Sequence, residues 1–409
     1  TWRRVLQRAY DDARGLDDMG LRAYATCAWA GQFAEREEAQ KALDAVAEVL
    51  VSLPSGPDDA DATAVCLQME SLAANRLGDT ARAVQSAQRA VAFEEGRGAP
   101  ANRVYPAVMV LATALRGAHE FGAASDAYRH ASALLEEQGL ADTVRAAVLL
   151  NNWSAMLQSA GQYLEAATLA GRAVAVARRA DTDNGASLTM LSTWAAALSA
   201  TGDFATATIA IDESLEKARV AGSVPRLVNS LAQAIVSATE AGDLPRATRL
   251  LAEARRAVPA DAATLSRAIL QLSEGRVALA QHRPEAAAEW TRQALGSLAS
   301  ANANQVSLLP TETFLARCLN TGGQFAEALA IAERSRATAT ERLGDQRYSS
   351  AVGAALLEVA TARRGLGDVD AARVAARQAV EHLRPTVGPV SPASRRAERL
   401  ATAEGPTVR

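Results

Sequence analysis

A short motif that returns at a nearly constant interval constrains this chain more than any other feature. Its clearest copies begin Gly161-Gln-Tyr163, Gly202-Asp-Phe204 and Gly323-Gln-Phe325, each with an alanine five residues after the glycine and a small residue seven further on. With weaker copies included, the motif starts at positions 31, 78, 119, 161, 202, 242, 282, 323 and 367, which we call the anchors. A repeat of 40–47 residues along the whole chain predicts stacked helical units rather than one large core.

Each part of the motif has a mechanical reason in a helical hairpin. Glycine ends the first helix because the chain must enter a left-handed conformation there. The aromatic residue is expected at the elbow, and the two small residues share one stripe of the second helix, where they admit a neighbouring helix. His119 and His282 replace glycine at two anchors, where we expect them to cap a helix end. A small residue also recurs seven positions before the anchor, at Ala112, Ser154, Ala195, Gly275, Ala316 and Ala360.

These residues resemble the tetratricopeptide family, and specifically its long-repeat, kinesin-light-chain-like type, because the period is about 41 residues instead of the usual 34. The resemblance implies an all-α, right-handed superhelical solenoid of about nine antiparallel hairpins over residues 1–384. Residues 385–409 are then a tail with a short capping helix. HEAT or armadillo repeats fit the period as well, but they lack the glycine–aromatic–alanine elbow.

The sequence carries no recognisable catalytic motif. It has no phosphate-binding glycine loop, no nucleophile elbow, no HExxH and no kinase catalytic loop. His130 and His382, like the two anchor histidines, lie apart from any metal-ligand pattern. Trp153 and Trp194 each stand eight residues before an anchor, and this regularity favours core packing over ligand stacking. We therefore expect neither a catalytic site, nor a cofactor, nor a metal.

Charge and hydropathy exclude two further classes of partner. The net charge is −3 with no cluster of Lys and Arg, so nucleic acid is not expected. Residues 146–164 and 184–202 are uncharged, but they are rich in amides and hydroxyls and contain a turn glycine, so we expect no membrane insertion. Cys27, Cys66 and Cys318 show no CxxC spacing and are interpreted as buried core residues without a disulfide. We expect a cytoplasmic protein, or a periplasmic one if its parent is a membrane-tethered kinase.

A second resemblance concerns the parent protein. The stretch Leu149-Leu150-Asn151-Asn152-Trp153, the stretch from Asn302 to Pro310, and the ending from Ala379 to Ala397 look similar to repeat regions joined to bacterial serine/threonine kinases. The match is weaker at Gly388–Pro392, where that family has an acidic His-Pro segment. The resemblance implies a kinase domain before Thr1, although no kinase-domain residue lies in this sequence.

Two functions remain open at this point. One is a protein- or peptide-binding scaffold or sensor module of a signalling protein; the other is the effector-sensing part of a transcription regulator. In either case the first helix of each hairpin is expected to line a concave groove that holds a protein or peptide ligand. The alternative is that the groove is filled by the protein's own segments. Counting back from the anchors, the predicted groove residues are Gln68, Asn75, Arg76, Met109, Thr113, Arg116, Asn151, Gln158, Thr189, Ser192, Ser199, Asn229, Arg276, Arg317, Asn320, Thr361 and Arg364.

Overall fold

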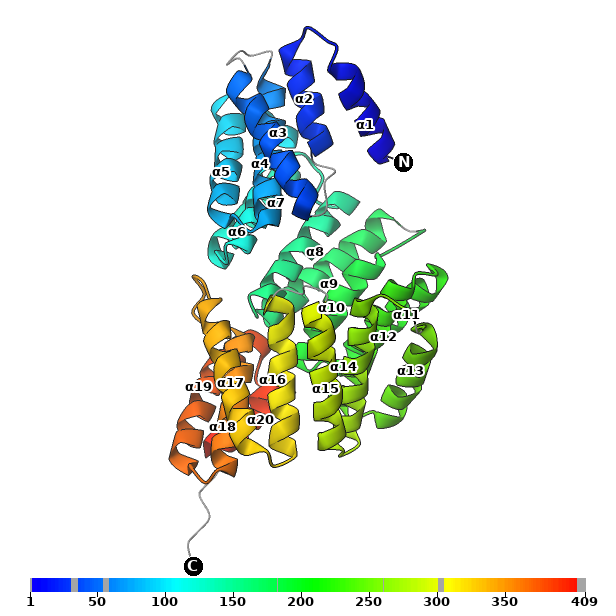
Figure 1. Cartoon of the computed structure of the whole chain (residues 1–409), viewed down its shortest axis with the longest axis vertical. Coiled ribbons are helices and arrows are strands. Elements are labelled where there is room, and N and C mark those ends of the chain that lie inside the picture. Colours follow the sequence, from blue (N-terminus) through cyan, green and yellow to red (C-terminus); the bar gives the residue numbers. More distant parts are fainter. Residues whose placement is uncertain are drawn as a thin grey trace, which may run out of the picture. The chain divides into compact units, whose positions relative to one another are not determined.

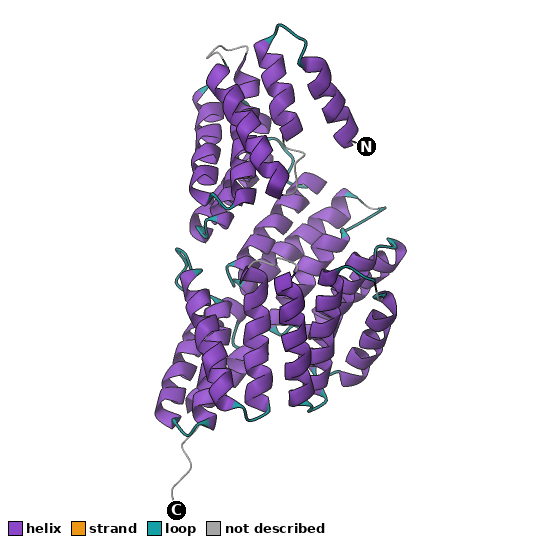
Figure 2. Ribbon diagram, in the orientation of Figure 1, coloured by secondary structure: helices purple, strands orange, loops and turns teal. Residues whose placement is uncertain are grey.

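The computed structural model describes residues 2–30, 36–53, 59–181, 183–259, 261–300 and 305–402, and within them it contains helices and no strand (Figure 2). The order of the helices is shown in Figure 1. The chain divides into two compact units, Thr1–Leu149 (the N-terminal unit) and Leu150–Arg409 (the C-terminal unit). The all-α architecture of consecutive antiparallel helix pairs is as predicted.

The helices pair in the register that the anchors predict. Eight pairs flank the anchors from residue 78 onward: α4 (Ala60–Leu77) with α5 (Thr80–Gly96), α6 (Ala101–Gly117) with α7 (Phe121–Glu137), α8 (Val144–Ser159) with α9 (Tyr163–Ala180), α10 (Leu188–Thr201) with α11 (Phe204–Val220), α12 (Val224–Ala241) with α13 (Leu244–Ala257), α14 (Thr264–Ala280) with α15 (Pro284–Ser300), α16 (Gln305–Thr321) with α17 (Phe325–Glu341), and α18 (Ser350–Gly365) with α19 (Val369–Val387). Before them lie α1 (Trp2–Ala13), α2 (Met19–Ala30) and α3 (Arg36–Ser52), and after them α20 (Pro392–Thr402).

The anchors adopt the conformation expected of them. All six glycine anchors from Gly78 onward have positive φ, and His119 and His282 do too, at 62° and 57°. These histidines therefore hold a backbone conformation that costs a side chain roughly 1–2 kcal/mol. The anchor predicted at Gly31 lies outside the described residues.

The small-residue stripe is the packing surface of the array. Both of its residues are buried in the second helix of each of the eight pairs from residue 78 onward, from Ala83 and Ala90 in α5 to Ala372 and Ala379 in α19. The small residues seven positions before the anchors are buried as well: Ala112, Ser154, Ala195, Gly275, Ala316 and Ala360. Helices can approach closely at such positions because the side chains between them are small.

The aromatic residue of the motif reaches further than the elbow of its own hairpin. A Cβ added to Gly365 of α18 would fall 2.3 Å from a ring carbon of Phe325, so this ring packs on the first helix of the next hairpin. Trp153 is buried and Trp194 packs at the edge of a core cluster, in line with their predicted role in packing. None of the described helices is long and apolar enough to cross a membrane.

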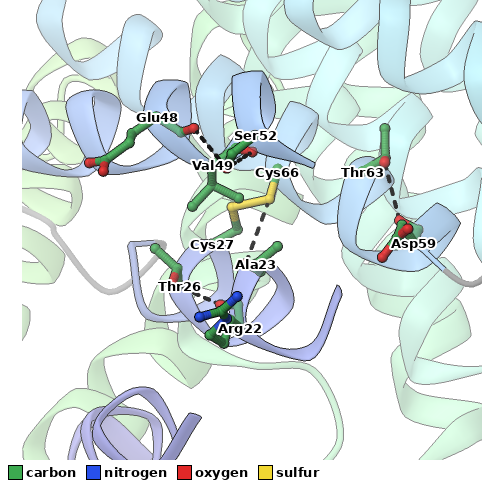
Figure 3. Close-up of a disulfide and its surroundings, with 10 residues drawn as sticks. All are labelled: Arg22, Ala23, Thr26, Cys27, Glu48, Val49, Ser52, Asp59, Thr63 and Cys66. Atoms are coloured by element: carbon green, nitrogen blue, oxygen red, sulfur yellow. Dashed lines mark hydrogen bonds between the residues drawn. A yellow bond between two sulfur atoms is a disulfide. The ribbon is translucent and has the colours of Figure 1, made fainter. Parts of the chain in front are cut away.

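One prediction about the N-terminal unit is wrong. Cys27 of α2 and Cys66 of α4 form a disulfide, with Cα atoms 5.0 Å apart (Figure 3). They are 39 residues apart in sequence, and α2 packs against α4, which brings them together. The pair belongs to the core of this unit, together with Ala30, Leu43 and Val46. Cys318 is buried and free, as predicted.

The C-terminal unit turns back on itself. The backbone N–H of Ser350 donates to the carbonyl oxygen of Gly161 at 3.2 Å, and the side chain of Gln162 donates to the carbonyl of Tyr348. A Cβ on Gly202 would fall 3.1 Å from the carbonyl oxygen of Val390. The turns at Gly161 and Gly202 thus receive the segments that precede α18 and α20. We call these two sets of interactions the closure contact.

Candidate functional site

A cavity of about 470 Å³ lies within the C-terminal unit. Its wall is built by the first helices of five successive hairpins, α10, α12, α14, α16 and α18, and is completed by residues of α9, α19 and α20. A volume of this size is typical of a site for a small molecule. The polar and charged residues of the lining are Tyr163, Ser199, Gln233, Glu240, Arg276, Thr313, Arg317, Ser350, Glu358 and Arg396.

The cavity wall follows the repeat. Four of the lining residues, Ala196, Val236, Arg276 and Arg317, stand six positions before their anchors and come from successive hairpins. The same structural position therefore presents two apolar side chains and then two arginines. The repeat places one residue of each of these hairpins in the cavity wall, and the residue type at this position decides whether the wall is apolar or positively charged there.

Two ion pairs line the cavity. Arg317 Nη1 lies 2.6 Å from Glu240 Oε1, and Arg396 Nη2 lies 3.1 Å from Glu358 Oε1. Glu358 is almost fully buried and also accepts a hydrogen bond from the Asn320 amide at 3.0 Å. Partners that supply both charge and hydrogen bonds are what a buried carboxylate requires.

Arg276 is the remaining charged residue of the lining. Among the residues that the structure describes, no carboxylate lies within 4.0 Å of its guanidinium. Its closest recorded interaction is with the ring of Phe314, whose centroid lies 4.5 Å from the guanidinium carbon. The five charged side chains sum to one positive charge, and Arg276 is the one without an ion-pair partner.

Burial and mutual attraction act on the acidity of these groups in opposite directions. Burial raises the pKa of Glu240, but attraction to Arg317 and then Arg276 outweighs it, and the net pKa is lowered. Burial lowers the pKa of Arg276, with partial opposition from Glu240. Burial also raises the pKa of the Cys318 thiol to about 11. At neutral pH we therefore expect Glu240 to be ionised and Cys318 to be a thiol.

Only some of the predicted groove residues of the C-terminal unit line the cavity. Arg276, Arg317 and Ser199 line the cavity. The others that make hydrogen bonds do so within the stack: Gln158 donates to the Thr193 carbonyl at 2.9 Å, Ser192 pairs with Ser214 at 3.1 Å, and Asn320 bonds Glu358. Asn151 is buried with its Oδ1 unpartnered, and Asn229 and Thr189 are exposed away from the lining.

The predicted residues of the N-terminal unit lie on α4 and α6. Gln68 is buried, and Asn75 is half-buried with its amide oxygen against Gly117. Met109 and Thr113 are half-buried, and Thr113 donates its hydroxyl to the Met109 carbonyl. Arg76 and Arg116 are exposed. Binding of a partner by any of these residues stays a prediction.

The helix α20 covers the inner stripe of α18. Thr361 and Arg364, both predicted to line the groove, instead border a depression with Arg396, Arg399 and Leu400 of α20. Binding of a partner at Thr361 and Arg364, and the alternative that the protein's own segment fills the groove, both stay predictions.

The sequence interpretation missed much of the cavity lining. Gln233, Phe314 and Glu358 all stand nine positions before their anchors, and this position was not included. It lies three residues from the position that carries Arg276 and Arg317, one helical turn away, so helical periodicity could have identified it. Arg396 was missed because it was assigned to the tail.

Comparison with known proteins gives matches in fold alone. No protein-family model and no curated protein matches the sequence. The apo form of RapI matches with a TM-score of 0.51 at 12% identity, covering 69% of this chain and 98% of RapI. BtubC (BKLC) from P. vanneervenii matches at 0.47 and 18% identity, over 54% of this chain and 91% of BtubC. A Rap protein complexed with Competence and Sporulation Factor matches at 0.44 and 12%, over 98% and 97%.

These similarities give no support to a linkage with a serine/threonine kinase. The match to RapI agrees with the consecutive helix pairs described above. The chain therefore has a TPR-like, all-helical repeat fold.

Proposed function

We propose that this chain is the effector-sensing part of a regulatory protein, in which a small ligand in the cavity of the C-terminal unit controls the closure contact. One observation carries the proposal: Ser350 belongs both to the cavity lining and to the closure contact. Its side chain lines the cavity, and its backbone N–H bonds the carbonyl of Gly161 in the closure contact. Tyr163, next to Gln162 of the closure contact, lines the same cavity.

A ligand that touches this shared wall changes the free energy of closure. It shifts the equilibrium only by the difference between its affinities for the closed and the open unit. The closed unit offers residues of α18, α19 and α20 that an opened unit would withdraw, so a bound ligand favours the closed form. This differential contact is what a sensor requires and a static scaffold does not.

The output of the sensor is contact with another protein or with a domain of the same polypeptide. This reading corresponds to the effector-sensing alternative of the sequence analysis more closely than to a scaffold. The proposal assigns no catalytic step to the chain.

The test is a thermal-shift screen of the whole chain against a mixed library of metabolites and short peptides. A hit is then measured in Ala354→Phe, which fills the cavity from α18, and in Ala337→Phe, a matched control on the exposed face of α17. We expect binding to be lost in the first variant and kept in the second. In a hydrogen-exchange experiment, the bound ligand should slow exchange at the backbone amide of Ser350.

Two results would contradict the proposal. One is a hit whose affinity survives Ala354→Phe, since that ligand binds outside the cavity. The other is a cavity ligand that leaves exchange at Ser350 unchanged, since binding and closure would then be uncoupled.

A further inference from the structure

Arg276 carries an unbalanced positive charge in the cavity wall. Arg317 and Arg396 are matched by Glu240 and Glu358 at 2.6 and 3.1 Å. Arg276 has no such partner among the described residues, and Glu240 acts on it only from beyond ion-pair distance. An arginine keeps its charge in proteins, so the site holds a half-buried cation with unused donors.

The position of Arg276 leaves those donors available. The guanidinium lies over the ring of Phe314, 4.5 Å from its centroid. A guanidinium stacked on an aromatic face keeps its N–H groups at the edge of its plane, where two of them match the two oxygens of a carboxylate. Phe314 and Arg276 both line the cavity, so the guanidinium borders the space in which a ligand would lie.

The rest of the wall selects an apolar body of limited length. Val236, Leu383 and Val387 are apolar lining residues, and Pro392 and Ala393 of α20 complete one side. The volume of about 470 Å³ lies in the lower part of the range of sites for small organic ligands. The side occupied by α20 is no longer available to an extended chain.

We propose that the effector is a compact monocarboxylic acid with an apolar body, whose carboxylate pairs with Arg276 and whose body lies against the α18–α20 side of the cavity. This inference rests on the proposed function and names its ligand class. The pairing brings the cavity to electrical neutrality, because the five charged side chains carry one net positive charge.

Isothermal titration of the full chain with matched pairs of probes tests the ligand class. The probes are 3-phenylpropanoic acid, octanoic acid and N-acetyl-leucine, each compared with its primary amide. A decapeptide of apolar residues with a free C-terminal leucine forms a separate arm, because it shares the carboxylate and exceeds the cavity. We expect at least one acid to bind about tenfold more tightly than its amide, the scale of a charge-assisted hydrogen bond. The decapeptide should bind more weakly than N-acetyl-leucine.

Arg276→Met is the decisive variant. Methionine retains an unbranched apolar stem and removes an unpaired charge, so we expect the variant to fold. Its preference for the acid over the amide should disappear. Arg226→Met, at an exposed position of α12 outside the lining, should keep it.

The outcomes separate this inference from the proposed function. If acids and amides bind alike, if the preference survives Arg276→Met, or if no acid binds at millimolar concentration, the ligand class is wrong, while a different cavity ligand in the screen still supports a sensor. A decapeptide that binds as tightly as the small acids overturns the size limit. If the screen finds no cavity ligand of any kind, the proposed function itself fails.

Discussion

Comparing Gly161→Ala with Gly242→Ala separates the stability contributed by the closure contact from the stability contributed by a left-handed turn within a hairpin. Gly161 has φ 78° and Gly242 has φ 80°, so alanine causes the same left-handed strain at both anchors. The difference lies in their surroundings. A Cβ on Gly161 would fall 2.4 Å from Ser349 Oγ and 2.8 Å from the backbone nitrogen of Ser350, whereas nothing lies within 4 Å of a Cβ on Gly242.

The expected magnitudes follow from this geometry. Gly242→Ala should lower the free energy of unfolding by about 1–2 kcal/mol, the cost of the left-handed conformation. Gly161→Ala adds the loss of the hydrogen bonds from Ser350 to Gly161 and from Gln162 to Tyr348. At about 1 kcal/mol for each bond, the difference between the two variants should be about 2 kcal/mol.

Urea unfolding gives the two free energies, and hydrogen exchange locates the effect. In Gly161→Ala we expect faster exchange at the amides of residues 346–350, with the amides of α12 and α13 unchanged. Gly242→Ala should show the reverse pattern. Equal losses of stability in both variants, or protection at Ser350 that stays intact, would mean that the closure contact contributes nothing beyond the hairpin.

Four further results are expected. Burial lowers the pKa of His382, whose Nδ1 accepts a hydrogen bond from the backbone N–H of Ser349 at 3.2 Å. Because the unfolded chain takes up the proton first as the pH falls, the contribution of His382 to the free energy of unfolding is complete above pH 6.5 and should decline below it. A His382→Gln variant with the same pH profile would contradict this. Glu358→Ala removes the carboxylate that pairs with Arg396 and accepts a bond from the Asn320 amide, and it should cost about 3 kcal/mol in urea unfolding; a cost below about 1 kcal/mol would be inconsistent with the burial of Glu358. Reduction of the disulfide between Cys27 and Cys66 should lower the stability of the N-terminal unit by up to about 4 kcal/mol for a separation of 39 residues, and identical denaturant midpoints with and without reductant would refute this. The purified chain should not hydrolyse ATP, and saturable turnover that persists through purification would be the contrary result.

The local architecture could be predicted from the sequence because the residues that determine the geometry of a hairpin all lie within one repeat. Glycine or histidine at the anchor sets the left-handed turn, and Ala166 with Ala173 sets the packing stripe within twelve residues of Gly161. The same counting identified Arg276 and Arg317, because position within a hairpin fixes which face a residue takes.

The ion pairs of the cavity, the closure contact and the disulfide depend on how separate hairpins are placed relative to one another, which the residues within one repeat do not determine. Glu240 and Arg317 are 77 residues apart, and their pairing depends on how much each hairpin rotates relative to the last. Gly161 and Gly202 look like any other anchor in the sequence, yet they also receive the segments before α18 and α20. The disulfide was missed for the same reason, since Cys27 and Cys66 meet only because α2 packs on α4.

The position of the disulfide has a consequence for the order of biosynthesis. Both cysteines lie in the N-terminal unit, upstream of every residue of the cavity. Because chains begin to fold from the N-terminus during synthesis, the covalent bond can form before translation reaches Leu150. A polypeptide delivered to an oxidising compartment then carries a disulfide-bonded N-terminal unit while the C-terminal unit is still being synthesised, whereas one retained among cellular reductants does not.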